Sequence, residues 1–356
     1  MQFSEARNQQ INSSYWSMRK DVVGSEIDLL TTVIAGGQFE RALKLSGPGR
    51  LIAAELSRPV KYTELLHQLI QHYPHHSENE LSVALRSMLR KFHEAGFIQA
   101  DRASLDSLNL SDPARSQRRS LERWALPNPD LLAVRLARWV KKLPSLYRHL
   151  LLDLLVAAAL FFLWQAIGHY APLDHLVAVT PGTVLMVICL WMTWIASHEL
   201  AHATVCRFYG FPVAGAGFMF RGFFVPSIYV NTSSVQLSSR RSLHFQVALA
   251  GPLSDLIFAG GCAAWMLIYD PLHPLFLVGE YASLGMVMGL FFNLTPFRAS
   301  DGSSMYYALF SSASHLTPAR GTLCRVSIGR LVFALWVVLY VMLVMVLLAR
   351  MTGMLP

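Results

Sequence analysis

The sequence predicts a mainly α-helical, polytopic membrane protein of about five transmembrane helices, with a membrane-dipping β-hairpin and an N-terminal winged-helix-like α+β domain. Hydrophobic residues make up 53% of the chain and charged residues only 15%. A soluble domain is roughly a quarter charged, so this balance indicates a membrane. The charges are also unevenly distributed, because residues 1–150 are polar and residues 150–350 consist of long apolar runs with short breaks. We therefore expect a soluble part followed by a membrane part.

The polar part carries the signals of a small α+β domain, which we place at residues 1–105. The turn signal Gly36-Gly37 separates two stretches rich in β-forming residues. Ser77 and Glu80 form a capping box at the start of a helix with apolar periodicity. We expect two strands over Ile27–Ala35 and Gln38–Leu45, followed by a short helix over Leu51–Leu56. Two longer helices are expected over Glu64–Tyr73, with Thr63 as N-cap, and from Ser77 to Gly96. A last strand is expected to start at Phe97-Ile98.

A linker and a basic segment follow, over residues 106–148. Residues 101–130 are rich in Ser, Asp, Arg and Pro, which is typical of a linker. Leu131–Leu150 has Leu and Val on one side and Arg and Lys on the other. This pattern fits an amphipathic helix lying along the membrane surface, and it fits a plain juxtamembrane helix equally well.

Five apolar stretches make up the membrane domain, which we place at residues 149–356. Each comes close to the about 20 apolar residues that a transmembrane helix needs. They are Leu150–Ile167, Thr183–Val205, Phe245–Ile268, Leu275–Phe292 and Leu331–Leu348.

The loops between these stretches predict the orientation. Arginines lie between the second and third stretches and between the fourth and fifth, whereas residues 168–182 and 269–274 contain neither Lys nor Arg. Basic loops face the cytoplasm. The N-terminus has no apolar core of a secretory signal peptide, in agreement with an N-terminal domain inside the cell. We expect the fifth stretch to leave the C-terminus outside.

The segment Phe211–Val230 is apolar but interrupted by prolines and glycines, among them Gly215 and Gly217. It is too broken for a transmembrane helix, and irregular backbone at membrane depth must be covered by protein or pair with itself. We expect an extended hairpin that dips into the cytoplasmic side of the bilayer. Its glycine-rich backbone, at Gly215 and Gly217, is a candidate surface for pairing with an extended substrate.

The second apolar stretch ends in an HExxH motif, formed by His198, Glu199 and His202. Residues i and i+4 share one face of a helix, so the two imidazoles can hold one ion. Glu199 lies beside that face and is a candidate proton acceptor from an activated water. A bare HExxH is a weak signal, but ionisable residues in an apolar helix are costly and usually functional. We predict a site for one zinc ion, with Glu199 as a catalytic base.

Asp301 is the predicted third ligand. From Thr183 to His198 a helix rises about 22 Å, and from Leu275 to Asn293 it rises about 27 Å. Both motifs therefore reach a similar depth near the cytoplasmic side, and Pro296 allows the chain to unwind and turn Asp301 inward. Taken alone, Asp301 fits a polar loop residue, but two histidines need a third protein ligand.

Asp255 is the competing carboxylate, because it also lies within an apolar stretch and needs a partner there. It could orient a ligand histidine or line the cleft. We rank it behind Asp301, as a residue that supports the ligands from outside the metal's own shell.

These residues resemble the motifs of the site-2 protease family of intramembrane zinc proteases. The correspondence covers the HExxH motif, the Asn293–Gly302 stretch that ends in Asp-Gly, the Ala250-Gly-Pro stretch and the Pro226–Asn231 stretch, which is similar to an element of the bacterial peptide zinc metalloprotease branch. The resemblance implies a bacterial inner-membrane zinc endopeptidase with its active site toward the cytoplasm. It makes Asp301 a zinc ligand, Asn293 a catalytic residue that holds the substrate or the developing oxyanion, and Asn231 a substrate-binding residue. Many members have Asn where this chain has Asp255.

The N-terminal unit resembles PqqD-like domains, the recognition elements for ribosomally synthesised, modified peptides. The similarity lies in the hairpin, the Leu43–Gly47 turn, the helix led by Thr63 and the Phe92–Ile98 ending. Such domains bind a leader peptide as an added strand on a sheet edge. The resemblance implies an edge within Asp28–Leu45 and a precursor peptide as partner.

Three functions fit these observations. The first is leader-guided cleavage of a modified peptide precursor, the second is regulated cleavage of a single-span protein such as an anti-sigma factor, and the third is a non-catalytic role in peptide binding or export with a structural zinc site. Membrane lipids are the other expected partners. The net charge of +8 comes from arginines and lysines at the ends of apolar runs, and no motif indicates nucleic-acid binding.

Overall fold

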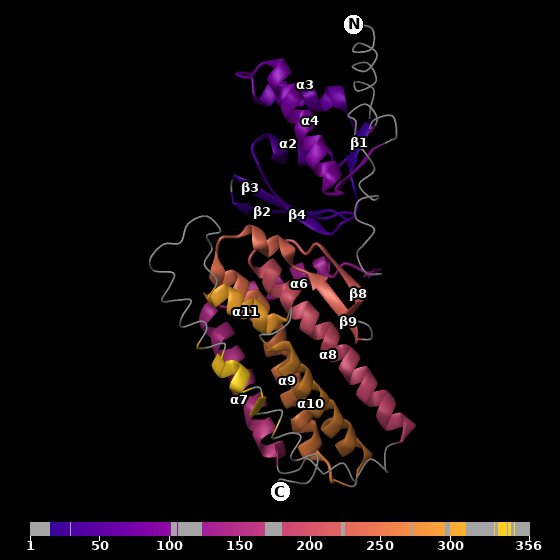
Figure 1. Ribbon diagram of the computed structural model, residues 1–356, viewed down its shortest axis with the longest axis vertical. Helices are drawn as coiled ribbons and strands as arrows, with labels where there is room; N and C mark the ends of the chain where they lie inside the picture. Colours follow the sequence, from indigo (N-terminus) through magenta and orange to yellow (C-terminus); the bar gives the residue numbers. More distant parts are fainter. Residues whose placement is uncertain are drawn as a thin grey trace. The chain divides into compact units, whose positions relative to one another are not determined.

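The computed structural model describes residues 15–28, 30–100, 105, 123–167, 180–221, 225–271, 273–295, 300–310 and short pieces between 331 and 345. The protein is mainly helical, with small sheets (Figure 1). Its contacts divide the chain into two compact units. Unit 1 comprises Met1–Val134 and Cys206–Leu237, and unit 2 comprises Arg135–Val205 and Ser238–Pro356.

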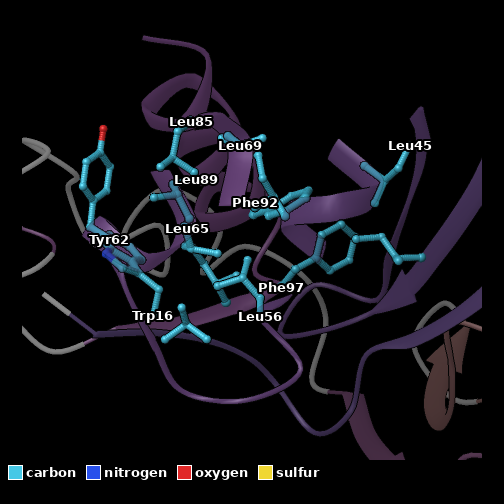
Figure 2. Close-up of a cluster of buried hydrophobic side chains, with 14 of the residues drawn as sticks. Trp16, Leu45, Leu56, Tyr62, Leu65, Leu69, Leu85, Leu89, Phe92 and Phe97 are labelled. Carbon is cyan, nitrogen blue, oxygen red and sulfur yellow. The ribbon is translucent and has the colours of Figure 1, made fainter. Parts of the chain in front are cut away.

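The N-terminal part of unit 1 is an α+β domain with two three-stranded antiparallel sheets. The first has the order β5-β1-β6 and the second the order β2-β3-β4. The strands are β1 (Tyr15–Met18), β2 (Val23–Asp28), β3 (Thr31–Gly36), β4 (Arg41–Ser46), β5 (Val60–Lys61) and β6 (Ile98–Ala100), and the helices are α2 (Pro48–Glu55), α3 (Tyr62–His72) and α4 (Glu78–Glu94). Aromatic and leucine side chains fill its core, among them Trp16, Leu85, Phe92 and Phe97 (Figure 2).

The predicted hairpin of this domain exists, but its strands are shifted. Ile27–Ala35 was expected to form one strand, whereas Ile27 belongs to β2 and only Thr31–Gly36 forms β3. The break is stabilised locally, because the Asp28 carboxylate accepts a hydrogen bond from the Leu30 amide at 2.9 Å. Strands β1 and β5 were not predicted, since each is short and they pair with each other across more than 40 positions. Strand β2, which pairs with its neighbour β3, was not predicted either.

The N-termini of helices α4 and α3 test the two predicted helix caps, at Ser77 and at Thr63. The capping box is confirmed, since Ser77 and Glu80 exchange both hydrogen bonds at the start of α4. Thr63 as an N-cap is wrong, because α3 begins at Tyr62 and its N-cap is Lys61, without a side-chain hydrogen bond. Helix α2 also begins earlier than expected, because Pro48 occupies its first turn, where a missing N–H costs nothing.

The other sheet of unit 1 contains the predicted hairpin of residues 211–230. Strands β8 (Gly215–Arg221) and β9 (Val225–Asn231) pair with each other, and β7 (Arg123–Leu126) pairs with the other side of β8. Strand β7 corrects the prediction of a plain linker over residues 101–130. The short helix η4 (Ser233–Leu237) follows β9.

A buried ion pair connects the start of α6 (Asp130–Lys142) with the end of α8 (Pro181–Phe208) within unit 1. Arg207 donates to both carboxylate oxygens of Asp130, with Nε 2.6 Å from Oδ1. The Val213 amide donates to the same Oδ1 at 2.9 Å. Since both charged side chains are buried, each depends on the other for its compensation.

Replacing Arg207 with Met is therefore expected to destabilise unit 1 by about 3–5 kcal/mol, because it leaves a buried carboxylate without its cation. Urea unfolding of the detergent-solubilised protein, followed by tryptophan fluorescence, measures the change. The double variant Asp130→Leu with Arg207→Met is expected to recover most of the loss. A single variant as stable as the parent protein would contradict the assigned role of the pair.

Among the residues that the structure describes, four helices are long and apolar enough to cross a membrane, which agrees with the coarse prediction of a membrane protein. They are α7 (Ser145–Ala166), α8, α9 (Arg241–Ile268) and α10 (Pro274–Asn293). Helix α9 packs against α7, α10 and the shorter α11 (Asp301–Phe310) (Figure 1). The basic helix α6 ends at Lys142, before the end predicted for it at Leu150. The fifth predicted span, Leu331–Leu348, lies largely outside the described residues, as do Pro296 and Gly222.

Candidate metal centre

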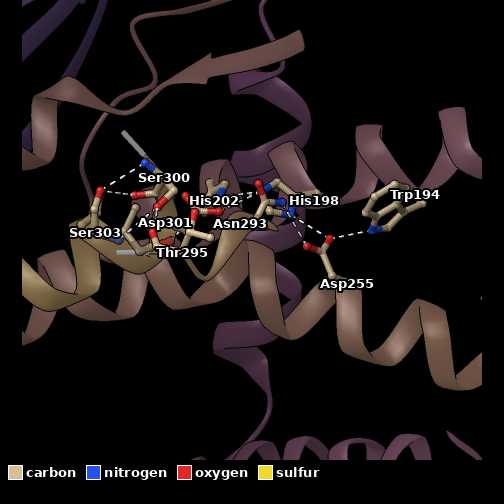
Figure 3. Close-up of polar contacts among 11 residues, drawn as sticks. Trp194, His198, His202, Asp255, Asn293, Thr295, Ser300, Asp301 and Ser303 are labelled. Atoms are coloured by element: carbon tan, nitrogen blue, oxygen red, sulfur yellow. Dashed lines mark hydrogen bonds and ion pairs between the residues drawn. The ribbon is translucent and has the colours of Figure 1, made fainter. Parts of the chain in front are cut away.

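Three potential metal ligands meet in unit 2. His198 and His202 lie one turn apart on α8, and Asp301 is the first residue of α11 (Figure 3). One ligand atom from each residue lies within 4.8 Å of the other two. The structure thus brings together the three residues that the sequence predicts as zinc ligands, and this cluster could hold a metal ion.

Hydrogen bonds at Nδ1 fix the orientation of both imidazoles. His198 Nδ1 lies 2.7 Å from Oδ1 of Asp255, and His202 Nδ1 lies 2.6 Å from the carbonyl oxygen of Val247. A carboxylate and a carbonyl can only accept, so each Nδ1 carries the proton in its bond. Each Nε2 then presents a lone pair, which is the arrangement that a metal-ligating histidine requires.

The lone pairs converge at metal-ligand spacing. The two Nε2 atoms are 3.1 Å apart, and Oδ2 of Asp301 lies 3.0 Å from His198 Nε2 and 3.4 Å from His202 Nε2. Ligand atoms at 2.0–2.1 Å from a tetrahedral zinc are about 3.3 Å apart, so the spacing fits. Three acceptors this close repel one another unless a cation lies between them. The chemistry of the donor set therefore fits zinc.

The start of α11 holds the Asp301 carboxylate in place. Ser300 is the N-cap, because its Oγ accepts from the Ser303 amide at 3.1 Å while Ser303 Oγ accepts from the Ser300 amide at 3.1 Å (Figure 3). The cap fixes the first turn of α11, where Oδ2 of Asp301 faces Nε2 of both imidazoles. A carboxylate ligates a metal ion in its ionised form.

Two glycines allow backbone to approach the site. A Cβ on Gly251 of α9 would lie 2.4 Å from His198 Cε1 and 2.4 Å from His202 Nε2, so only glycine leaves room for the two rings. A Cβ on Gly302 would lie 2.3 Å from the carbonyl oxygen of Leu294. The resemblance of the Ala250-Gly-Pro stretch includes Gly251 but implies no role for it. Its role was not predicted, although a glycine before a proline inside an apolar helix is the signal that could have indicated it.

Asp255 supports His198 from a fully buried position. Its carboxylate accepts hydrogen bonds from His198, from Trp194 Nε1 at 2.6 Å and from Asn293 Nδ2 at 3.4 Å (Figure 3). Trp194 has room because its neighbour on α10 is Gly289, where a Cβ would lie 2.2 Å from the ring. Sequence reasoning ranked Asp255 as a supporting residue but missed Trp194, which carried no signal in its own stretch.

The other predicted site residues divide between the two units. Glu199 is half-buried beside the ligands, and its charge acts electrostatically on His202. Asn293 contacts Asp255 with its amide, at the end of α10. Gly215, Gly217 and Asn231 belong to the β8–β9 hairpin in unit 1, where their contacts are with Glu40 and Tyr229.

Fold and site together define a mainly helical membrane protein with a cluster that could bind a metal ion. Comparison of the chain with protein-family models, with curated proteins and with solved structures finds no match.

Proposed function

We propose that this protein is an intramembrane zinc endopeptidase that cleaves a precursor peptide bound through its leader by the N-terminal domain. The observation that carries the proposal is the convergence of two imidazoles and a carboxylate at zinc-ligand spacing, with both imidazoles and Glu199 on the apolar helix α8. Buried ionisable groups are expensive in such helices and usually serve a function.

His198, His202 and Asp301 would hold the zinc ion, because imidazole and carboxylate are ligands that zinc prefers and three protein ligands leave one position open. Zinc held there would supply a water whose pKa is about 7 and a Lewis acid for a peptide carbonyl. Asp255 and the Val247 carbonyl would keep both rings in the ligating tautomer.

Glu199 and Asn293 would act on the peptide bond. Glu199 would take a proton from the attacking water and deliver it to the leaving nitrogen, as a general base and then a general acid. Asn293 uses one amide N–H toward Asp255, and the amide has a second N–H for the developing oxyanion.

The order of the β7-β8-β9 sheet restricts the strand edges with which an extended substrate can pair. Strand β8 already has partners on both sides, so an added strand would use the outer edge of β9 or of β7. The expectation that a substrate strand pairs with β8 at Gly215 and Gly217 therefore holds only if β7 first leaves.

A groove in the N-terminal domain supports leader binding. It has a volume of ≈ 830 Å³ and lies beside β2, which is an edge strand of the β2-β3-β4 sheet. Its lining includes apolar, cationic and acidic groups, namely Val22, Leu30, Ile34, Leu51, Tyr73, Arg19, Lys20, Arg50 and Glu26. Strand β3 is central and paired on both sides, whereas β2 and β4 are the two edges, and β4 overlaps the range Asp28–Leu45 expected to contain the edge. Because the groove lies beside β2, an added peptide strand would pair with β2.

The Glu199→Gln variant tests the proposal. Purified protein in detergent would be incubated with candidate precursor peptides, with and without their leaders, and the products read by mass spectrometry. Loss of the general base is expected to lower the rate by roughly 100-fold to 10,000-fold while zinc stays bound. Asp270→Asn, an exposed carboxylate beyond the end of α9, is the matched control and should cleave like the parent protein.

Processing that continues in Glu199→Gln with zinc still bound would exclude this catalytic role and leave peptide binding or export. Cleavage of a single-span protein but of no leader-bearing peptide would support regulated intramembrane proteolysis instead.

A further inference from the structure

A carboxylate from the β3–β4 turn is bound at the base of the β8–β9 hairpin, within unit 1. The Tyr229 hydroxyl donates to the Glu40 carboxylate, 3.1 Å from Oε1 and 3.2 Å from Oε2. Asn231 Nδ2 donates to the main-chain carbonyl of Glu40 at 2.8 Å and lies 3.4 Å from its Oε2. Both the side chain and the backbone of Glu40 are thus held by β9.

Two glycines of β8 make this arrangement possible. A Cβ on Gly215 would lie 3.0 Å from both Cδ and Oε1 of Glu40, and one on Gly217 would lie 2.6 Å from the Tyr229 hydroxyl. In the hairpin register, Gly215 is opposite Asn231 and Gly217 is opposite Tyr229. One glycine therefore admits the carboxylate and the other admits the ring that binds it.

The backbone conformation of Glu40 indicates that the contacts of its side chain hold this residue in place. Its φ is 48°, the only positive φ of a non-glycine residue in the part of the chain that the structure describes. Glycine or asparagine is the ordinary choice there, and a glutamate persists in that region only where its surroundings fix it. The turn is fixed on its other side as well, because the Gln38 amide donates to the Gly96 carbonyl at 2.9 Å.

We propose that Tyr229, Asn231 and Gly215 form a carboxylate-binding site whose ligand is the Glu40 side chain, and that this contact couples the peptide-recognition domain to the hairpin. Gly96 lies two residues after the end of α4, so the path from that helix to β9 runs through one short turn. The carboxylate-binding site does not depend on the proposed function, whereas the coupling between the domain and the hairpin rests on it.

Hydrogen exchange of the full-length protein in detergent tests the site without any cleavage. Glu40→Asn keeps a residue that accepts positive φ but is too short to reach Tyr229, and Tyr229→Phe removes the donor alone. Both variants are expected to speed amide exchange in β8 and β9 by roughly tenfold, the equivalent of one lost charge-assisted hydrogen bond. Glu64→Gln, an exposed carboxylate on α3, should leave exchange unchanged.

Unchanged exchange in β8 and β9 in both variants would overturn the site. For the coupling, Glu40→Asn is expected to reduce cleavage of a leader-bearing peptide to the rate of the leaderless peptide. A preserved leader advantage would overturn the coupling. If the parent protein cleaves neither peptide, the proposed function fails, and the exchange data still decide the carboxylate site.

Discussion

Replacing Asp301 with Asn is expected to reduce zinc affinity by more than about 100-fold, since loss of a supporting residue alone costs 10–100-fold and Asp301 is proposed as a direct ligand. The amide keeps the shape of the carboxylate but loses its negative charge, which offsets the charge of the ion. Zinc content after purification, measured by elemental mass spectrometry, and competition with a fluorescent chelator give the affinity.

The matched control is Asp270→Asn, an exposed carboxylate beyond the end of α9 in the same unit. It should retain the zinc of the parent protein. An Asp301→Asn protein that binds zinc as tightly as the control would remove Asp301 from the ligand set and, with it, the geometric basis of the proposed function.

Gly251→Ala is expected to abolish metal binding without unfolding the protein. The added methyl group would lie 2.4 Å from both His198 Cε1 and His202 Nε2 and 2.6 Å from His198 Nε2. These distances are far below a normal carbon contact, so at least one ring must move out of the ligand position. Alanine is a better helix former than glycine, and α9 itself should persist. Zinc content and helical circular dichroism measure the two effects separately.

Gly261→Ala is the control for this experiment, because it lies in the same helix and a Cβ there meets nothing within 4 Å. It should bind zinc normally. A Gly251→Ala protein that retains full zinc would show that the rings are not confined by α9, which would contradict the described geometry.

The sequence predicted the parts of the site that depend on local geometry. HExxH places His198 and His202 on one helix face by helical periodicity alone. The similar rise of two apolar stretches predicted that Asp301 lies near them. The capping box at Ser77 followed from chemistry within four residues. The HExxH and capping signals lie within one helix and its ends, whereas the placement of Asp301 required a comparison of two apolar stretches.

The remaining features depend on contacts between distant residues. Nothing near Trp194 indicates that it donates to Asp255, 61 positions away, and nothing near Glu40 indicates Tyr229. Strand β7 is only four residues long and gains its pairing from β8. Thr63 had the right chemistry for an N-cap, but the chain enters α3 directly from β5, so Tyr62 is already helical.

The partners of the two imidazoles differ in kind. His202 is oriented by a main-chain oxygen of Val247, which no substitution can remove and which does not titrate in any biological range. His198 is oriented by Asp255, whose side chain can change by mutation. Of these two partners, only residue 255 can therefore change during evolution to alter how tightly a metal ion would be bound. An Asn at that position would make His198 the weaker donor of the pair while leaving His202 as it is.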